Sequence, residues 1–356
     1  MNEVIQEDVR ALTEELRDTV AALAGTTLLV TGGSGFLASY LLDSVAWFND
    51  YLLARPCRLI SMDNLRSGKA ERTAHLSARP EFRFVETDIS QPFDLGEHVD
   101  WIVHGAGIAS PTFYRRYPLE TIDVNVSGTR QVLELARRDG VRSVVSLSTS
   151  EIYGDPDPRF IPTAEDYRGH VSCTGPRACY DESKRLGETL CAVYRGLYGL
   201  PVKVVRPFNV YGPGQRLDDR RIIPDLMAAA VSQRPLVLYG DGRATRSFCY
   251  IRDAIHALWL ILISDADGEV FNIGNDEGEI TIRELALLVQ KIAGPPPPEL
   301  QFAASTDPHY LTDNPQRRCP DLTKLRRWFP WQPRVSLAEG LRRTLRSYGQ
   351  RPANGG

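Results

Sequence analysis

Residues 27–42 read TLLVTGGSGFLASYLL and contain the pattern that decides the fold. An apolar run ends in clustered glycines, and apolar residues at helical spacing follow, which predicts a strand, a tight turn and a helix. Gly33, Gly35 and Ala38 fit G-x-G-x-x-G/A, and Gly32 with Gly35 and Ala38 fits the variant G-x-x-G-x-x-A. In such a turn the backbone can approach a pyrophosphate that faces the free N–H groups of the helix. Because any tight turn needs glycine, the motif alone indicates a dinucleotide site only weakly.

The elements that follow alternate between strand and helix. Apolar runs predict further strands, and helical spacing predicts long helices between them. The predicted strands are at 57–62, 82–88, 101–107, 143–149 and 202–206, and the helices at 37–48, 120–139 and 177–197. This alternation predicts an α/β protein with a Rossmann-type, doubly wound parallel sheet.

The domain organisation is expected to follow the same pattern. Beyond about residue 210 the alternation weakens, and turn signals such as GPPPP at 294–298 become frequent. We expect four parts along the chain. They are an N-terminal helical extension at 1–24, an NAD-binding core at 25–210, a smaller mixed substrate-binding domain at 211–345 that could return a strand to the core sheet, and a disordered tail at 346–356. The helix predicted at 4–23 would serve in packing or dimer contact.

The second predicted strand ends at Asp63, which is placed to accept the ribose hydroxyls of a bound adenosine. Its distance from the glycines exceeds the usual ~20 residues, and residues 49–56 look like an insertion that lengthens this crossover. Because a carboxylate would repel a 2′-phosphate, Asp63 favours NAD over NADP.

Composition narrows the class of protein. The 356 residues are 42% hydrophobic and carry a net charge of −3, so no basic field suggests nucleic acid. The six cysteines form no C-x-x-C pair or metal-ligand spacing, so we expect free thiols and no metal. The apolar stretch at 254–263 is too short to span a bilayer, and the first residues lack the apolar core of a signal peptide. We therefore expect a cytoplasmic protein that does not bind membranes.

Two segments carry candidate catalytic groups. Tyr180 and Lys184 lie four positions apart and so on one helix face, where the cation is expected to lower the pKa of the phenol toward neutrality. Such a tyrosine can remove a proton from a sugar hydroxyl while a hydride leaves the same carbon. Thr149, Ser150 and Glu151 follow the fifth predicted strand, at the edge of the sheet where ligands bind in doubly wound folds.

At this point the chain resembles the extended short-chain dehydrogenases/reductases that modify nucleotide sugars. The likeness covers nearly the whole chain, and the combination of its motifs is highly specific. The matching segments are TGGSGFLA at 31–38, DNL at 63–65, HGA at 104–106, NVSGT at 125–129, STSEIYG at 148–154, Y-x-x-x-K at 180–184, RPFNVYGP at 206–213 and YIRD at 250–253.

Within that family the chain looks most like UDP-glucuronate decarboxylases, also called UDP-xylose synthases. The segments that carry this finer likeness are SPTFYRRYP at 110–118, TSE at 149–151, GPRACYDESKR at 175–185, TRSF at 245–248 and PQRRCPD at 315–321. The chain departs from the pattern at Ser183, Cys319, Gly105 and the insertion at 49–56.

The resemblance implies a role for each candidate residue. Thr149, Tyr180 and Lys184 would oxidise C4 of the sugar, and Ser150, Glu151 and Arg318 would act around its carboxylate. The implied substrate contacts are Tyr114 with the sugar, Asn209 and Arg246 with the diphosphate, Tyr239 near the uracil, and also Arg216 and Arg318. The implied NAD contacts are Gly32, Gly35, Phe36, Leu37, Asp63, Asn64, Asp88, Ile89, Gly105, Tyr180 and Lys184.

Several alternatives remain open from the residues. A UDP-glucuronate 4-epimerase would need the same carboxylate clamp and need only suppress loss of CO2. A 4,6-dehydratase is disfavoured because Ser150 stands where that subfamily carries the aspartic acid that expels water. A non-catalytic NAD-binding regulator is disfavoured by the intact Thr149, Tyr180 and Lys184. The resemblance also implies a homodimer built on the helices at 120–139 and 177–197.

Overall fold

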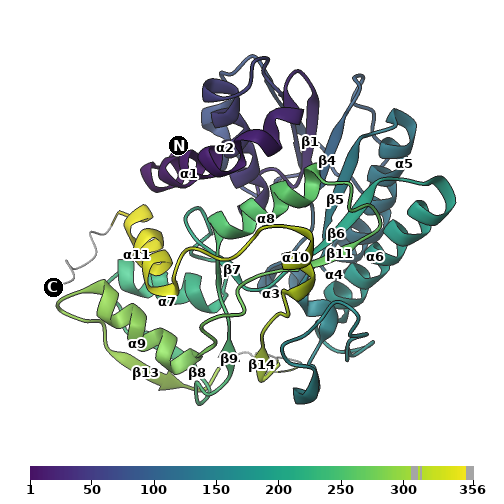
Figure 1. Ribbon diagram of the computed structural model, residues 1–356. Helices are drawn as coiled ribbons and strands as arrows, with labels where there is room; N and C mark the ends of the chain where they lie inside the picture. The colour runs from purple at the N-terminus through teal and green to yellow at the C-terminus, as the bar shows by residue number, and fades with distance from the viewer. Residues whose placement is uncertain (306–311, 313–314, 350–356) are drawn as a thin grey trace.

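The computed structural model describes residues 1–305, 312 and 315–349, and its centre is a seven-stranded parallel sheet (Figure 1). The sheet order is β3-β2-β1-β4-β5-β6-β11, with every neighbouring pair parallel. The strands are β1 Thr27–Thr31, β2 Arg58–Asp63, β3 Phe82–Glu86, β4 Trp101–His104, β5 Ser143–Leu147, β6 Val202–Pro207 and β11 Val270–Ile273. The predicted doubly wound fold is confirmed. β11 comes from the C-terminal third of the chain and pairs with β6 at the edge of the sheet.

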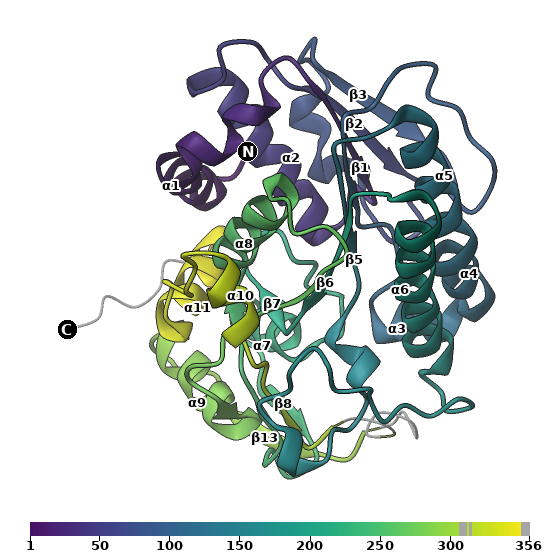
Figure 2. The same ribbon diagram turned by 45° about the vertical axis from the view of Figure 1, so that its right-hand side comes forward.

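Helices cover both faces of this sheet (Figures 1 and 2). One face packs against α2 Phe36–Tyr51 and α8 Ile251–Ile263, with α1 Glu3–Val20 lying over these two. The other face packs against α5 Thr129–Asp139 and α6 Ala178–Tyr198. α4 Pro118–Asp123 and α3 Pro111–Arg116 lie on this face toward the carboxyl ends of the strands. The central strands are almost wholly buried apolar segments, as a sheet covered on both faces requires.

A smaller lobe lies beyond the carboxyl ends of the strands (Figure 1). Its short strands form three small sheets: β8 Leu236–Tyr239 with β13 Leu300–Ala303; β9 Thr245–Arg246 between β12 Ile280–Thr281 and β14 Arg317–Arg318; and β7 Val210–Tyr211 with β10 Cys249–Tyr250. Its helices are α7 Ile222–Val231, α9 Ile282–Ala293 and α11 Leu337–Ser347, whereas α10 Thr323–Trp328 packs against β11 of the main sheet.

The C-terminal helix extends past the boundary expected at 345. α11 continues through Ser347, and the hydroxyl of Tyr348 donates a hydrogen bond to the carbonyl of Gln215. Residues 350–356 of the expected tail lie outside the described residues.

The predicted helix at 120–139 is interrupted. α4 runs into a π-helical turn, Val124–Gly128, before α5 begins. The amide of Asn125 in this turn donates to the hydroxyl of Ser183 on α6, at 2.9 Å. A π turn shifts the helix register by about one residue, which hydrophobic spacing alone does not reveal.

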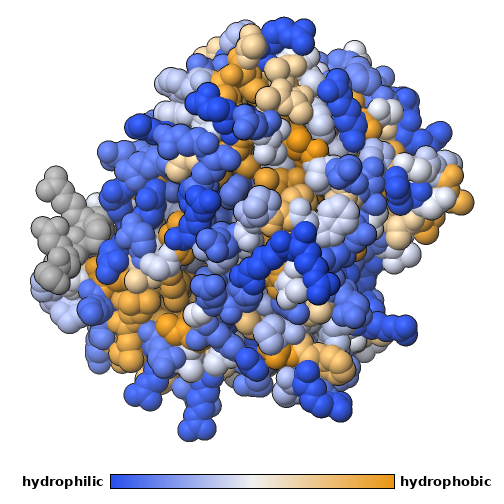
Figure 3. All heavy atoms as spheres, viewed as in Figure 1, coloured by the Kyte–Doolittle hydropathy of each residue, from blue (hydrophilic) through white to orange (hydrophobic). Residues whose placement is uncertain are grey.

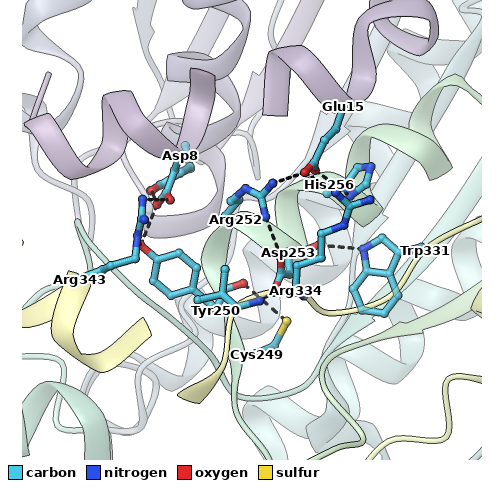
Figure 4. Close-up of polar contacts among 12 residues, drawn as sticks. Asp8, Glu15, Cys249, Tyr250, Arg252, Asp253, His256, Trp331, Arg334 and Arg343 are labelled. Atoms are coloured by element: carbon cyan, nitrogen blue, oxygen red, sulfur yellow. Dashed lines mark hydrogen bonds and ion pairs between the residues drawn. The ribbon is translucent and has the colours of Figure 1, made fainter. Parts of the chain in front are cut away.

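α1 is fixed to the rest of the molecule by two buried clusters of polar side chains (Figure 4). Asp8 is fully buried and accepts hydrogen bonds from Tyr40 of α2, from Tyr250 at 2.7 Å and from Arg343 of α11 at 2.6 Å. α1 therefore joins the N-terminal half of the sheet layer to the smaller lobe.

The second cluster lies further along α1. Glu15 pairs with Arg252 of α8 and, at 2.6 Å, with Arg334, while His256 lies 3.7 Å away. Apolar residues of α1 such as Leu12 and Leu16 complete its buried face.

The helices in the part of the chain that the structure describes can be compared with what a membrane span requires. No helix there combines the length and apolarity needed to cross a bilayer. Figure 3 shows that hydrophilic side chains dominate the face seen in Figure 1, with hydrophobic areas between them.

Candidate active site

One cavity of about 1600 Å³ runs between the carboxyl ends of the sheet strands and the smaller lobe. All the residues that the sequence singles out for catalysis, cofactor binding or substrate binding line it. They are Gly32, Gly35, Phe36, Leu37, Asp63, Asn64, Asp88, Ile89, Gly105, Tyr114, Thr149, Ser150, Glu151, Tyr180, Lys184, Asn209, Arg216, Tyr239, Arg246 and Arg318.

The glycine turn between β1 and α2 forms one end of the cavity. Gly32 has φ +70°, and a Cβ there would lie 2.7 Å from the Cα of Ala106. A Cβ on Gly33 would lie 2.0 Å from the Ser61 hydroxyl. Both positions therefore need glycine so that the turn can pack closely against its neighbours at residues 61 and 106.

The same turn presents unused hydrogen-bonding groups. α2 begins at Phe36 with Gly35 as its N-cap, and no side chain caps the first N–H groups. The hydroxyl of Ser34 is buried and has no hydrogen-bond partner. A buried orphan hydroxyl beside an uncapped helix N-terminus fits the pyrophosphate of a dinucleotide.

Asp63 lies at the end of β2, beside this turn. Its carboxylate accepts hydrogen bonds from the backbone N–H of Ser34 at 3.0 Å and of Leu65 at 2.8 Å. Burial raises the pKa of Asp63, and the backbone N–H groups oppose that effect. Next to it, the amide of Asn64 donates to Asp88 at 3.3 Å. These groups form a polar rim suited to an adenosine ribose.

Tyr180 and Thr149 meet in the middle of the cavity. The two side chains share a hydrogen bond, and the Tyr180 ring is buried. Burial raises the pKa of Tyr180 to about 12, and the Thr149 hydrogen bond offsets part of this rise. The predicted lowering of this pKa by Lys184 is therefore wrong for this structure, because burial disfavours the phenolate more than the neighbouring groups favour it.

Lys184 instead directs its ammonium at the backbone carbonyl of Leu147, at 2.8 Å. Burial lowers the pKa of Lys184 to about 8, and Glu188 opposes that shift. The lysine consequently remains mainly protonated at neutral pH, one helical turn from Tyr180.

Tyr114 lies against Tyr180. Its ring is stacked on that of Tyr180, with centroids 5.1 Å apart and planes 7° from parallel. The predicted sugar contact of Tyr114 stays a prediction. The stacking shows that Tyr114 also fixes the orientation of the Tyr180 ring.

A buried cluster of charges occupies the substrate end. Thr149 caps a 3-10 turn, Ser150–Tyr153, which carries Ser150 and Glu151. Arg318 from β14 makes a bidentate ion pair with Glu151, with Nη2 at 2.7 Å from Oε2, and Arg177 pairs with the same carboxylate. Burial acts to raise the pKa of Glu151, but Arg177 and Arg318 together hold this pKa well below its usual range.

Arg177 was not among the residues singled out from the sequence. It is the residue before α6 and lies three positions ahead of Tyr180, whose backbone N–H donates to the Arg177 carbonyl at 2.9 Å. Its place within the GPRACYDESKR segment is the signal that would have identified it.

The remaining substrate candidates belong to the smaller lobe. Arg246 donates to the carbonyls of Thr245 and Pro315, at 2.7 and 2.6 Å. Its pKa is lowered to about 10, first by burial and then by the nearby charge of Arg318. Arg216 donates to the carbonyl of Ser67 at 2.7 Å and so ties together two loops on opposite sides of the cavity.

Two further candidates complete the cavity wall. Asn209 has φ +41° and donates to the Ser247 carbonyl at 2.9 Å, and Tyr239 is 38% exposed at the end of β8. Their predicted contacts with the diphosphate and the uracil stay predictions. Among the described residues, no cluster of His, Cys, Asp and Glu has the arrangement needed to hold a metal ion.

The comparison with protein families decides the assignment. The sequence profile of the NAD dependent epimerase/dehydratase family matches residues 28–274. The chain belongs to this family. The family match spans the glycine turn, Thr149, Tyr180 and Lys184, and NAD is the cofactor of this family member.

Individual relatives agree with this membership. UDP-glucuronic acid decarboxylase 1 of Arabidopsis thaliana is 39% identical over 327 residues, which cover 92% of this chain and 71% of the relative. A UDP-glucuronic acid 4-epimerase from Bacillus cereus, solved with UDP-glucuronic acid and NAD, is 26% identical with a TM-score of 0.74, covering 90% of this chain and 98% of that one. A dTDP-glucose 4,6-dehydratase from Streptomyces venezuelae, solved with NAD, is 30% identical with a TM-score of 0.78, covering 90% and 96%.

Proposed function

We propose that this family member decarboxylates UDP-glucuronate to UDP-xylose through a 4-keto sugar, recycling its NAD within one turnover. The observation that carries the proposal is the buried arginine pair, Arg177 and Arg318, beside Thr149 and Tyr180. A uronic acid has its carboxylate two bonds from C4, so arginines next to the C4 chemistry suit such a substrate. The 39% identical relative named as a UDP-glucuronic acid decarboxylase supports the same activity.

The chain supplies the proton transfers at C4. Bound NAD, held by the glycine turn and Asp63, would supply the hydride chemistry at C4. Tyr180 takes the proton of the C4 hydroxyl, and Thr149 orients that hydroxyl by hydrogen bonding. Because the pKa of Tyr180 is raised to about 12, the phenol needs added positive charge to act as a base. Lys184 is protonated at neutral pH, but the raised pKa of Tyr180 already applies with Lys184 in place, so the further charge would have to come from the oxidised cofactor when it is bound.

The chain also controls the bond that breaks. Arg318 holds the C6 carboxylate through two parallel hydrogen bonds. Once C4 is a ketone, this carboxylate lies β to it, so the C5–C6 bond can break, CO2 leaves and the electron pair enters the enolate. Ser150 and Glu151 act around C5, where a proton must then be added before the ketone is reduced.

The main alternative is 4-epimerisation of a nucleotide sugar, which one of the similar solved structures supports. The epimerase from Bacillus cereus shares the fold and was solved with UDP-glucuronic acid, so a carboxylate clamp also serves that reaction. A 4,6-dehydratase fits less well because Ser150 supplies no acid for expelling water.

The discriminating experiment incubates the enzyme with UDP-glucuronate, UDP-glucose and dTDP-glucose without added NADH. The nucleotide sugars are then separated by chromatography that resolves C4 epimers, and each is analysed by mass. A UDP-sugar lighter by one CO2, formed from UDP-glucuronate alone, is the expected result. A product of unchanged mass indicates an epimerase, and a product lighter by water indicates a dehydratase. No product from any of the three would favour the non-catalytic regulator.

A homodimer is part of the proposal. Side chains that expose apolar surface cluster on α4 and α6, which pack together. They are Leu119, Ile122, Leu186, Val193, Leu197 and Tyr198. Burying such a face against a second copy removes its apolar area from water. Leu197→Asp should shift the mass measured by light scattering to that of a monomer, whereas Leu287→Asp on α9 should not.

The location that we infer is the cytoplasm. All six cysteines are free thiols, and four of them are buried. Proteins of oxidising compartments more often pair their cysteines in disulfides. Cell fractionation with an antibody to the chain tests this inference.

A further inference from the structure

The cluster around Glu151 brings several arginines close to one buried carboxylate. Three guanidinium groups, those of Arg177, Arg318 and Arg246, influence one another and Glu151. The acidic groups in direct contact are Glu151 itself and Asp181, which lies 3.6 Å from Arg177. Arg177 and Arg318 thus converge on one carboxylate, and such a geometry also suits the carboxylate of a substrate.

The hydrogen bonds show where a second carboxylate has to enter. Both terminal nitrogens of Arg318 donate to Glu151, and Arg177 donates to Glu151 as well. Arg246 is directed at the carbonyls of Thr245 and Pro315. A substrate carboxylate that binds both terminal nitrogens of Arg318 competes with Glu151 for them. At Arg177 the buried Nε has no hydrogen-bond partner, so this guanidinium can accept a second carboxylate beside Glu151.

The position of Arg177 relative to the C4 chemistry is fixed by the fold. Its carbonyl accepts the backbone N–H groups of Tyr180 and Asp181 in the first turn of α6. Glu151 is likewise two residues from Thr149, whose hydroxyl accepts the Glu151 N–H at 3.2 Å. The Arg177–Glu151 pair therefore lies next to the two side chains that would hold the C4 oxygen of a sugar.

We propose that Arg177 is a specificity-determining residue that shares the substrate's carboxylate with Arg318, and that this carboxylate enters by displacing Glu151 from the two arginines. The inference rests on the proposed function. It adds a binding site for the substrate's carboxylate, formed by Arg177 and Arg318, and the displacement of Glu151 from that site. Displacement frees Glu151 for the steps at C5, so only a sugar that brings its own carboxylate releases it. A neutral nucleotide sugar leaves Glu151 paired with both arginines.

The first test concerns Arg177 and compares ligands that differ only at C6. Affinities for UDP-glucuronate, UDP-glucose and UDP-xylose are measured by calorimetry for the wild type, Arg177→Gln and Arg177→Lys. Loss of a charge-assisted hydrogen bond should weaken UDP-glucuronate binding about tenfold or more in Arg177→Gln, and less in Arg177→Lys. Binding of UDP-xylose should stay within about twofold of the wild-type value, because UDP-xylose has no carboxylate for Arg177 to bind.

The control for this test is Arg10→Gln, which removes an exposed arginine of α1 whose side chain is 73% exposed. It should leave all three affinities unchanged. Equal weakening of all three ligands in Arg177→Gln would overturn the specificity role, since a structural residue would act in that way.

The second test concerns the exchange itself. Glu151→Gln removes the competing negative charge and keeps the shape of the side chain. If Glu151 competes with the substrate's carboxylate, Glu151→Gln should bind UDP-glucuronate about tenfold more tightly while its affinity for UDP-xylose stays unchanged. Weaker or unaltered UDP-glucuronate binding would show that Glu151 and the substrate do not compete, and would overturn the exchange.

Both tests are separate from the test of the reaction, because they measure binding and not turnover. If the wild type proves to be a uronate epimerase, these affinities can still confirm that Arg177 binds the substrate's carboxylate and that this carboxylate displaces Glu151. If the wild type releases CO2 but the affinities fail to change as stated, the proposed function stands and the inference is wrong.

Discussion

Tyr180 is the side chain on which the proposed chemistry at C4 depends. Its pKa of about 12 and its hydrogen bond with Thr149 describe a buried phenol that holds its proton at neutral pH. Tyr180→Phe keeps the ring and its stacking on Tyr114 but removes the oxygen that takes the proton. We expect turnover to fall by about 10²-fold or more with NAD binding unchanged. Product formation and NAD titration measure the two effects.

The matched control is Tyr51→Phe, because Tyr51 lies at the end of α2 with its side chain largely exposed. It should turn over at the wild-type rate. Substantial activity in Tyr180→Phe would remove Tyr180 from its assigned role.

Glu151 should matter more after the oxidation of C4 than during it. Its carboxylate lies among arginines and not on the phenol, so Glu151→Gln leaves Tyr180 and Thr149 intact. We expect the 4-keto sugar and reduced cofactor to form at near-normal rates in a single turnover, and the final product to form slowly. Stopped-flow absorbance with quenched-flow product analysis separates these phases. An unchanged rate of product formation would contradict the role.

His104 joins three elements at the centre of the fold. Its two ring nitrogens lie 2.8 Å from the Thr31 hydroxyl of β1 and 3.0 Å from the Thr129 hydroxyl of α5. Burial lowers the pKa of His104 to about 3 from its ordinary value of 6.5, so the folded protein keeps this ring neutral. The unfolded chain binds a proton at this ring below pH 6.5, and stability is therefore lost as the pH falls through this window.

This linkage gives a measurable pH dependence. Between pH 6.5 and pH 4, the free energy of unfolding of the wild type should fall by about 3 kcal/mol more than that of His104→Asn. Denaturant titrations at several pH values measure both proteins, and the difference cancels the titration of the carboxylates. Parallel pH profiles for the two proteins would contradict the assignment of a buried neutral histidine.

Local sequence patterns predicted the helices and strands well where these elements are marked by regularly spaced apolar residues that become buried. The strands after the glycine turn lie where the apolar runs predict them, because a sheet covered on both faces needs such runs. The π turn at Val124–Gly128 was not predicted, since it depends on packing against α6. The pKa of Tyr180 was misjudged for a related reason: helical spacing shows which cation is near, but burial depends on the whole fold.

The site shows the same limit. The resemblance to the family identified Glu151 and Arg318, although 167 positions separate them. Their pairing depends on β14 lying beside β9 in the smaller lobe, which no local pattern predicts. Arg177 was missed because an arginine before a helix has no distinctive spacing of its own.

At the scale of the whole molecule, α1 links the sheet layer to the smaller lobe, and it precedes the segment matched by the family profile. Asp8 bonds to α2, to Tyr250 and to α11, so its cluster spans both parts that enclose the cavity. Removing its charge leaves Arg343 with only Glu7 as an acidic partner, and Glu7 is partly exposed. We expect Asp8→Asn to lower the free energy of unfolding by about 3 kcal/mol. Thermal and denaturant unfolding measure this change.

Asp18→Asn is the control, because Asp18 is an exposed aspartate on the same helix. Its stability should match that of the wild type within about 0.5 kcal/mol. Equal stability of the Asp8 and Asp18 variants would show that α1 contributes by its apolar face alone.

The central claim is that one site oxidises C4, releases C6 and reduces C4 with the same hydride. The most direct measurement uses UDP-glucuronate labelled with ¹³C at C6 and deuterium at C4, with no added NADH. The proposed function predicts ¹³CO2 and a UDP-xylose that still carries deuterium at C4. A product that retains ¹³C in a carboxylate, with the configuration at C4 inverted, would contradict decarboxylation and assign the enzyme to the epimerases.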